Sequence, residues 1–247
     1  MKPSSIYLEF QPSSRFTTTV ECFWILSAAG EIRQAVLPDG CCDFIFSTTH
    51  SRGPQTHVVG TMTKPRSVTL SAGDWLMGVR FHPGAARSWL PCPAGVLTDQ
   101  VVPLDELWGK RADELLGATS PAAPPTNNVA AWERVLGDPP ACTGGRGAIA
   151  RWIAQSSELS LSQSAGEVGV SDRQFRRLCL NGAGLTPKKL ARVLRFRRAL
   201  AYAKSHPAVD MPQLAVDCGY FDQSHMIRDF NEFAGRSPSR LVENVSA

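Results

Sequence analysis

The sequence predicts two domains. The first, at residues 1–140, is a mixed β-barrel with helices; the second, at residues 145–247, is all-α, with two helix-turn-helix units joined by a linker helix. Short β-branched and aromatic runs fill the first third of the chain, a Gly- and Pro-rich stretch interrupts it at residues 137–147, and helical periodicity follows. At 247 residues, the chain is long enough for each domain to bury a core.

The N-terminal strands are predicted from four runs bounded by turn residues: residues 19–26, 41–47, 57–61 and 75–81. Residues 37–40, Leu-Pro-Asp-Gly, combine the fixed φ of Pro with the permissive φ of Gly and predict a tight turn. Short strands at this spacing favour a barrel or a sandwich. Beyond them we expect short helices at 103–116 and 128–136, separated by a Pro-rich loop at 118–127.

Composition places the chain among globular proteins, with 43% hydrophobic and 19% charged residues. No apolar run approaches the ~20 residues of a bilayer span, and residues 1–16 do not resemble a signal peptide. We therefore expect a cytoplasmic protein without a membrane partner. The seven cysteines are scattered without a C-x-x-C pair, so disulfides are not expected, and buried packing is a simpler role for them than sensing.

Charge is unevenly distributed along the chain. Residues 1–144 hold 11 basic and 13 acidic side chains, whereas residues 145–247 hold 15 and 9. A basic C-terminal domain attracts nucleic acid, acidic lipid or an acidic protein.

The first helix-turn-helix unit is predicted from two capping boxes. Ser160 with Gln163 begins one helix, and Gly169 ends it by allowing the positive φ of a sharp turn. Ser171 with Gln174 then caps a second helix, and Val170 and Phe175 occupy the positions of a hydrophobic staple. Phe175, Leu178 and Cys179 share the inward face of this second helix, and the outward face carries Arg173, Arg176 and Arg177.

The same pattern recurs about fifty residues later. Asp210 with Gln213 at N3 begins a helix that ends at Cys218-Gly219, and Asp222 caps the next, with Phe221 and Met226 as the expected staple pair. The inward face of that helix is expected to hold Met226, Asp229, Phe230 and Phe233. The outward face presents Gln223, Ser224, His225, Ile227 and Arg228 near the N-terminus, where a recognition helix approaches base edges.

A linker helix is expected between the two units, from Thr186-Pro187 to about Lys204. At 1.5 Å per residue it measures ~27 Å, enough to hold two recognition helices about one DNA turn, or ~34 Å, apart. Lys188 and Lys189 lie at the positive end of its dipole, where an anion such as phosphate would stabilise them. A solvated basic face explains the same residues equally well.

Several spaced motifs resemble the DNA-binding domain of the AraC/XylS family of transcription regulators, over residues 148–242. They are Ser171-Asp-Arg-Gln-Phe-Arg-Arg-Leu, Gly184-Leu-Thr-Pro-Lys-Lys, Arg195-Phe-Arg-Arg-Ala-Leu, Ala215-Val-Asp-Cys-Gly-Tyr-Phe-Asp-Gln-Ser-His-Met-Ile-Arg-Asp-Phe and Gly235-Arg-Ser-Pro. The resemblance implies seven helices whose two units read neighbouring major-groove segments on one face of a promoter. A regulator of this family that binds a promoter is also expected to have RNA polymerase as a partner.

Residue by residue, the expected base-reading set is Arg173, Arg176, Arg177, Gln223, Ser224, His225, Ile227 and Arg228. The expected phosphate-contacting set is Ser171, Lys188, Lys189, Arg195, Arg198 and Asp222. Three positions depart from the family pattern: Ser164, Gly166 and Ile227. A Gly within a helix costs about 1 kcal/mol relative to Ala, and Ile227 suits a thymine methyl better than a hydrogen bond.

The N-terminal stretches at 37–41, 78–86 and 102–109 look like the cupin-like domain of a subset of these regulators. That resemblance implies a domain that senses a small-molecule effector or forms a homodimer.

Two alternatives remain open: a metal-dependent cupin-type enzyme fused to a DNA-binding domain, and a protein-binding adaptor. His50, His57 and His82 could supply imidazoles, but the close Glu and second His of a cupin metal site do not follow them. No nucleophile elbow, P-loop or H-E-x-x-H motif occurs. We therefore expect no enzyme activity, no catalytic metal and no cofactor. Arg, Gln and Ser at the recognition-helix N-termini favour DNA over an adaptor role.

Overall fold

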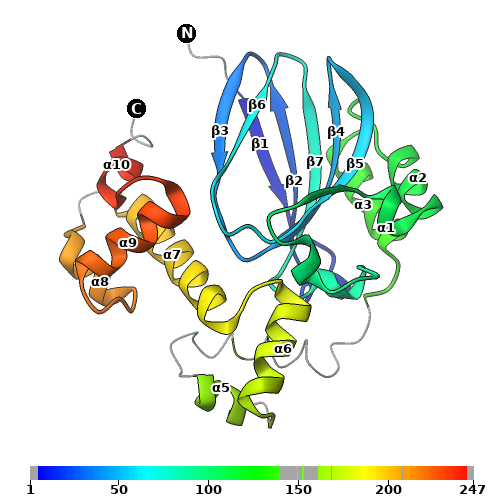
Figure 1. Ribbon diagram of the computed structural model, residues 1–247. Coiled ribbons are helices and arrows are strands. Elements are labelled where there is room, and N and C mark those ends of the chain that lie inside the picture. Colours follow the sequence, from blue (N-terminus) through cyan, green and yellow to red (C-terminus); the bar gives the residue numbers. More distant parts are fainter. Residues whose placement is uncertain are drawn as a thin grey trace.

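The computed structural model describes residues 5–139, 149, 152, 161–167, 169–206 and 209–243. A β-rich N-terminal part is followed by a helical C-terminal part, in which helix α7 runs from α6 to the cluster of α8, α9 and α10 (Figure 1). The predicted cap at Ser160, Cys142 and most of the stretch at 137–147 lie outside the described residues. Among the described helices, none combines the length and apolar character that crossing a bilayer requires.

Six antiparallel strands form the main sheet, in the order β1-β2-β7-β4-β5-β8. Their bounds are β1 Ser5–Phe10, β2 Val20–Ala28, β4 Cys42–Thr49, β5 Arg52–Val59, β7 Trp75–Phe81 and β8 Val101–Pro103. A second sheet pairs β3 (Ile32–Val36) with β6 (Arg66–Leu70). The four predicted runs correspond to β2, β4, β5 and β7, and the predicted turn holds Gly40 at a φ of 84°. Strands β1 and β8 are the edges of the larger sheet.

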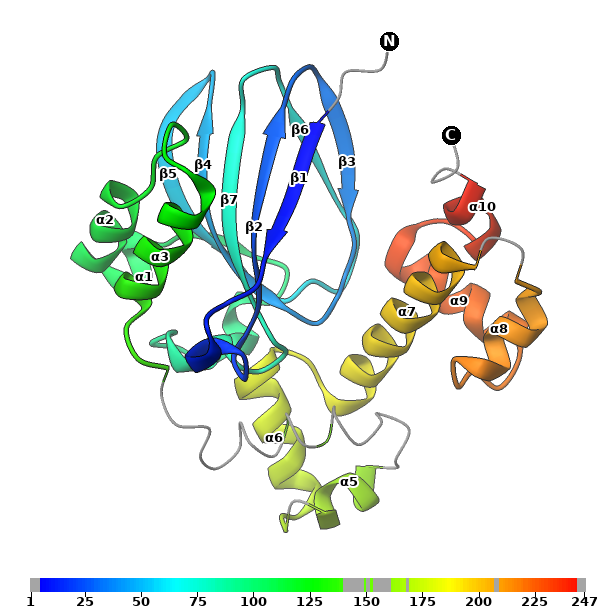
Figure 2. The same ribbon diagram turned by 180° about the vertical axis from the view of Figure 1, so that it is seen from behind.

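Successive side chains of β2 point to opposite faces of the larger sheet, and both faces are apolar and covered. Phe23 and Ile25 face a core that also contains Trp132 and Leu115 from the helices, whereas Cys22 and Trp24 face the smaller sheet. The covering helices, on the side of the larger sheet away from α7 (Figure 2), are α1 (Asp105–Trp108), α2 (Lys110–Gly117) and α3 (Pro125–Leu136). The predicted helix at 103–116 corresponds to α1 and α2, and the predicted helix at 128–136 corresponds to α3, which begins three residues earlier, inside the predicted loop. Three 3-10 turns complete this part: η1 (Ser14–Phe16), η2 (Ala86–Ser88) and η3 (Ala94–Leu97).

The described C-terminal helices are α5 (Leu161–Glu167), α6 (Asp172–Ala183), α7 (Pro187–Ser205), α8 (Met211–Asp217), α9 (Gln223–Ala234) and α10 (Pro238–Glu243). Gly169 has a φ of 69° in the turn before α6, as predicted. The two halves of the predicted capping box between Ser171 and Gln174 are both present, and Thr186 caps α7 with Pro187 following it. These predictions are confirmed: each cap and its partner lie within four residues of one another.

Two details of the second unit were predicted wrongly. Phe221 is 90% exposed while Met226 is fully buried, so the two side chains do not form a staple. Asp210 stands at the N-cap of α8 but makes no capping hydrogen bond, and Gln213 instead donates to Asp217 Oδ1 at 2.7 Å. An i, i+4 side-chain pair on the helix surface has therefore replaced the expected capping box.

Gly60 lies where the chain leaves β5, against the backbone of η3. A Cβ at this position would lie 1.8 Å from the carbonyl oxygen of Leu97. We therefore expect Gly60→Ala to lower the free energy of unfolding by about 3 kcal/mol, since a backbone atom would have to move. Gly53→Ala, within β5, is the control because its Cβ would meet no atom within 4 Å. Equal unfolding midpoints in urea for the two variants would contradict the packing described here.

Candidate nucleic-acid interface

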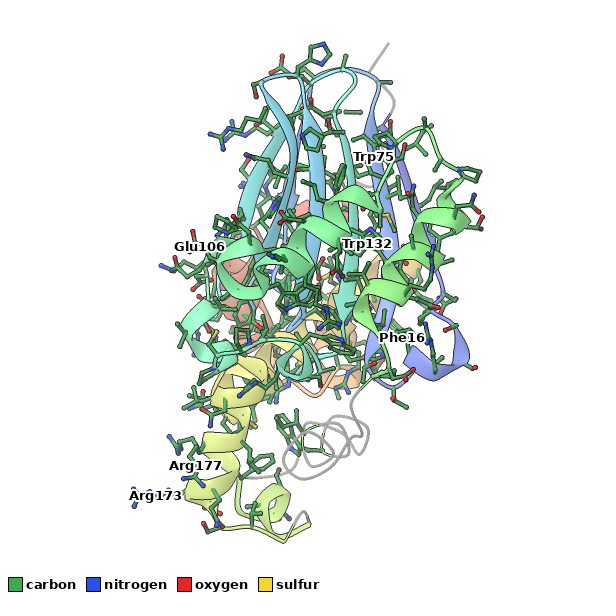
Figure 3. The ribbon with its side chains drawn as sticks, turned by 90° about the vertical axis from the view of Figure 1, so that its right-hand side faces the viewer. Phe16, Trp75, Glu106, Trp132, Arg173 and Arg177 are labelled. Carbon is green, nitrogen blue, oxygen red and sulfur yellow. The ribbon has the colours of Figure 1, made fainter. Side chains whose placement is uncertain are left out.

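Helix α6 presents three arginines to solvent. Arg173, Arg176 and Arg177 are exposed, and none has an acidic partner within salt-bridge distance among the residues that the structure describes. Their spacing of three and four residues places them on one face, and Figure 3 shows Arg173 and Arg177 pointing away from the body of the protein. The cap at Ser171 fixes where this helix, and hence this basic face, begins.

The opposite face of α6 is anchored in the C-terminal core. Phe175 and Cys179 are fully buried, and the Phe175 ring meets the Trp152 ring edge-on at 5.5 Å between centroids. Burial raises the pKa of the Cys179 thiol to about 12, so this cysteine packs as an apolar side chain. The inward and outward faces predicted for this helix are thus both observed, with Leu178 half-buried between them.

Helix α9 holds the second predicted set. Asp222 Oδ1 accepts a hydrogen bond from the backbone N–H of His225 at 2.7 Å, which fixes the start of the helix. Ser224 and Arg228 are exposed one turn apart, whereas Gln223, His225 and Ile227 are half-buried. The inward residues Met226, Asp229, Phe230 and Phe233 are buried as predicted. The His225 ring packs edge-on against Tyr220, with 5.3 Å between centroids.

An ion-pair network between α7 and α9 was not predicted from the sequence. Arg192 donates to Asp229 Oδ1 through Nη2 at 2.6 Å and Nε at 3.0 Å. The Arg192 guanidinium also pairs with Glu232, and so does the Lys189 ammonium. Burial alone would lower the pKa of Arg192, but its hydrogen bonds to the two carboxylates raise it. The sequence did contain one signal: Asp229 lies on the predicted inward face of its helix, and a buried carboxylate needs a cation beside it.

Several predicted phosphate contacts also have partners within the protein. The Arg195 guanidinium lies 5.3 Å from the centroid of the Tyr220 ring, and Arg198 donates to the carbonyl of Cys218 at 2.7 Å. Ser171 and Asp222 serve as helix caps, while Lys188 is exposed at the start of α7. Much of the basic face of the linker therefore stabilises the second unit, in contrast to the open face of α6.

In the N-terminal part, the polar side chains that face the smaller sheet form a cluster around Asp43. Its carboxylate accepts from Trp24 Nε1 at 3.0 Å and pairs with Arg80 at 3.2 Å. Burial raises the pKa of Asp43 to about 6, although Arg80 opposes the shift. Burial likewise raises the pKa of the thiols of Cys22, Cys41 and Cys42.

The three histidines considered as metal ligands lie on different segments. His57 is on β5, His50 follows β4 and His82 follows β7. Burial lowers the pKa of His57 below its usual value. Within the described part of the chain, no three His, Cys, Asp or Glu side chains are grouped so that they could hold a metal ion.

Two family models match separate parts of the chain. Residues 164–244 match a helix-turn-helix domain, and residues 8–103 match a domain of unknown function (DUF6597). No curated protein matches the chain. The helix-turn-helix match spans α6, the linker and α9, where the basic and polar faces described above lie.

Several solved structures are similar to this chain over shares that range from 40% to the full length. A transcriptional regulator with an AraC-type DNA-binding domain from Chromobacterium violaceum is 26% identical over 40% of this chain and 88% of its own, with a TM-score of 0.37. A DNA-binding transcriptional dual regulator from Escherichia coli K-12 is 24% identical over 42% and 94%, with a TM-score of 0.37. ToxT from Vibrio cholerae is 9% identical over 91% and 98%, with a TM-score of 0.47.

The family match and the motifs of α6, α7 and α9 lead to one conclusion. Residues 164–244 form a helix-turn-helix domain similar to those of DNA-binding transcription regulators of the AraC/XylS type, and they follow a β-rich N-terminal part.

Proposed function

We propose that α6 and α9 enter neighbouring major-groove segments of a promoter and read base edges there. The observation that carries this proposal is the exposed face of Arg173, Arg176 and Arg177 on a capped, well-packed helix. Arginine is suited to this role because its guanidinium can donate two hydrogen bonds to guanine O6 and N7. On α9, Ser224 and Arg228 are the most accessible candidates, with Gln223, His225 and Ile227 beside them.

The length of the linker helix suits two recognition helices that enter neighbouring major-groove segments. Helix α7 has 19 residues, which is ~28 Å at 1.5 Å per residue and close to the ~34 Å of one DNA turn. Figures 1 and 2 place α6 and α9 toward opposite ends of this helix. Lys188, Lys189, Arg195 and Arg198 are the proposed phosphate contacts of the linker. Lys188 is exposed, whereas Lys189, Arg195 and Arg198 have contacts within the protein. Ser171 and Asp222 act at the helix starts, where backbone N–H groups approach phosphate.

We further propose that residues 145–247 bind DNA and that residues 1–140 regulate them without catalysing a reaction. The regulatory role rests on the separate β-rich core and its cluster around Asp43. A small-molecule effector, a second copy of the chain and RNA polymerase are the partners proposed for the whole protein, which acts in the cytoplasm.

Selection from a random DNA pool tests the function directly. The full-length protein is expected to enrich duplexes with two conserved segments about 10 base pairs apart, one for each recognition helix. Binding should weaken steeply as salt rises, because phosphate contacts release counterions. An adaptor that binds protein through the same basic surface would enrich no sequence from the pool.

A further inference from the structure

The N-terminal part is attached to the linker helix and to the end of α6 by specific polar and apolar contacts. The Thr98 hydroxyl donates to the carbonyl of Gly184, the C-cap of α6, at 2.8 Å. Leu37 packs against the C-terminal core, and a Cβ on Gly40 would lie 3.1 Å from Leu190 Cδ1. The turn before β4 therefore lies directly on the first half of α7.

One ion pair joins the two parts near the middle of α7. Arg197 donates from Nη1 to Glu21 Oε2 at 3.1 Å, and its Nη2 contacts Glu21 Oε1. Glu21 lies on β2, so the pair links residues 176 positions apart in sequence. Burial alone would raise the pKa of Glu21, but its hydrogen bonds and the charge of Arg197 lower it. The pair is thus formed in the ionised state near neutral pH.

A continuous chain of polar contacts leads from this ion pair into the β-rich domain. The Cys41 thiol donates to Glu21 Oε2 at 3.3 Å, and the Cys41 backbone N–H donates to Asp39 Oδ1 at 2.9 Å. Asp39 pairs with Arg80 at 3.3 Å, and Arg80 pairs with the buried Asp43 at 3.2 Å. Each step is a hydrogen bond or an ion pair of 3.3 Å or less.

We propose that Glu21 and Arg197 are positioning residues, which fix the pose of α7 and make it responsive to the cluster around Asp43. The pair holds the linker at its middle, and the Thr98 contact holds the end of α6, so the N-terminal part determines how the two recognition helices are aligned. The effect of this alignment on DNA binding rests on the proposed function, whereas the coupling of the N-terminal part to α7 does not.

Hydrogen exchange of the full-length protein, without DNA, measures the coupling. Glu21→Gln and Arg197→Gln should each speed amide exchange in α7 by about five- to tenfold, because local opening is no longer opposed by the pair. The double variant should exchange no faster than either single variant, since the two changes remove one shared interaction. Arg197→Lys keeps the charge and should largely restore slow exchange. Effects of the two Gln variants that add together would overturn the proposal.

A separate variant tests the part of this chain of polar contacts that lies around Asp43. Asp43→Asn should also speed exchange in α7, and exchange that rises in β4 alone would show that the cluster is not connected to the linker. Glu106→Gln, on α1 at the far side of the domain (Figure 3), removes an equal charge and should change nothing in α7. Matching unfolding midpoints would establish that each variant is folded before its exchange is compared.

A DNA measurement separates this proposal from the function on which it rests. Glu21→Gln should weaken binding to a duplex with both selected segments about fivefold and leave binding to one segment unchanged, since only the paired arrangement needs a fixed linker. Tighter binding with a salt slope steeper by about one unit would mean that Glu21 merely masks Arg197 from phosphate, and would contradict the positioning role. If no variant binds DNA but the exchange results hold, the proposed function fails and the coupling stands.

Discussion

Replacing Arg192 by Ala is expected to lower the free energy of unfolding by about 3 kcal/mol, since it leaves the buried Asp229 carboxylate without its cation. The Asp229 side chain is 1% exposed, and its Oδ2 has no hydrogen-bond partner in the described structure. The Arg192 side chain is itself 26% exposed. This places the expected loss at the lower end of what breaking a buried pair costs. Urea unfolding of the two proteins measures the difference.

Glu232→Gln is the control for that experiment. Glu232 pairs with the same arginine, but its side chain is 39% exposed, so we expect its loss to cost less than about 1 kcal/mol. If both variants unfold at the wild-type midpoint, the network does not hold α9 on the linker. Should Arg192→Ala also abolish DNA binding at temperatures where it is fully folded, Arg192 would have a direct role in binding that we do not assign to it.

Arg177→Ala is expected to weaken binding to the selected site by about 1–3 kcal/mol and to relax the preference at one base pair. Arg177 is exposed on α6 with no acidic partner among the described residues, so its guanidinium is available for a guanine edge. Arg173→Ala should behave in the same way at a different base pair. Arg134→Ala, which removes an exposed arginine from α3, is the matched control and should leave both affinity and preference unchanged.

Features that depend on neighbouring residues could be predicted from the sequence. The capping box at Ser171, the Thr186-Pro187 start of α7 and the positive φ of Gly169 follow from three or four adjacent residues. The inward faces of α6 and α9 follow from the 3.6-residue period. The β-branched and aromatic runs predicted β2, β4, β5 and β7, but no run was recognised for β1, β3, β6 or β8.

Features that depend on tertiary contacts could not be predicted. Arg192 and Asp229 are 37 positions apart, and Arg197 and Glu21 are 176 apart, so no local pattern couples them. The sequence alone presents the basic residues of the linker as a single surface, whereas Lys189, Arg192, Arg197 and Arg198 have partners within the protein. Phe221 was expected to pack by its position next to the Asp222 cap, but the surrounding fold leaves it exposed.

One measurement distinguishes base reading by α6 from backbone contact by the linker helix. The affinities of the wild type, Arg177→Ala and Arg195→Ala are measured for the selected site and its single-base variants at several salt concentrations. We expect Arg177→Ala to lose discrimination at one base pair. We expect Arg195→Ala to bind all sequences more weakly by the same factor and to reduce the salt slope by about one unit. If Arg195→Ala alters base preference while Arg177→Ala only shifts the overall affinity, the roles of reader and backbone contact are reversed and the account is wrong.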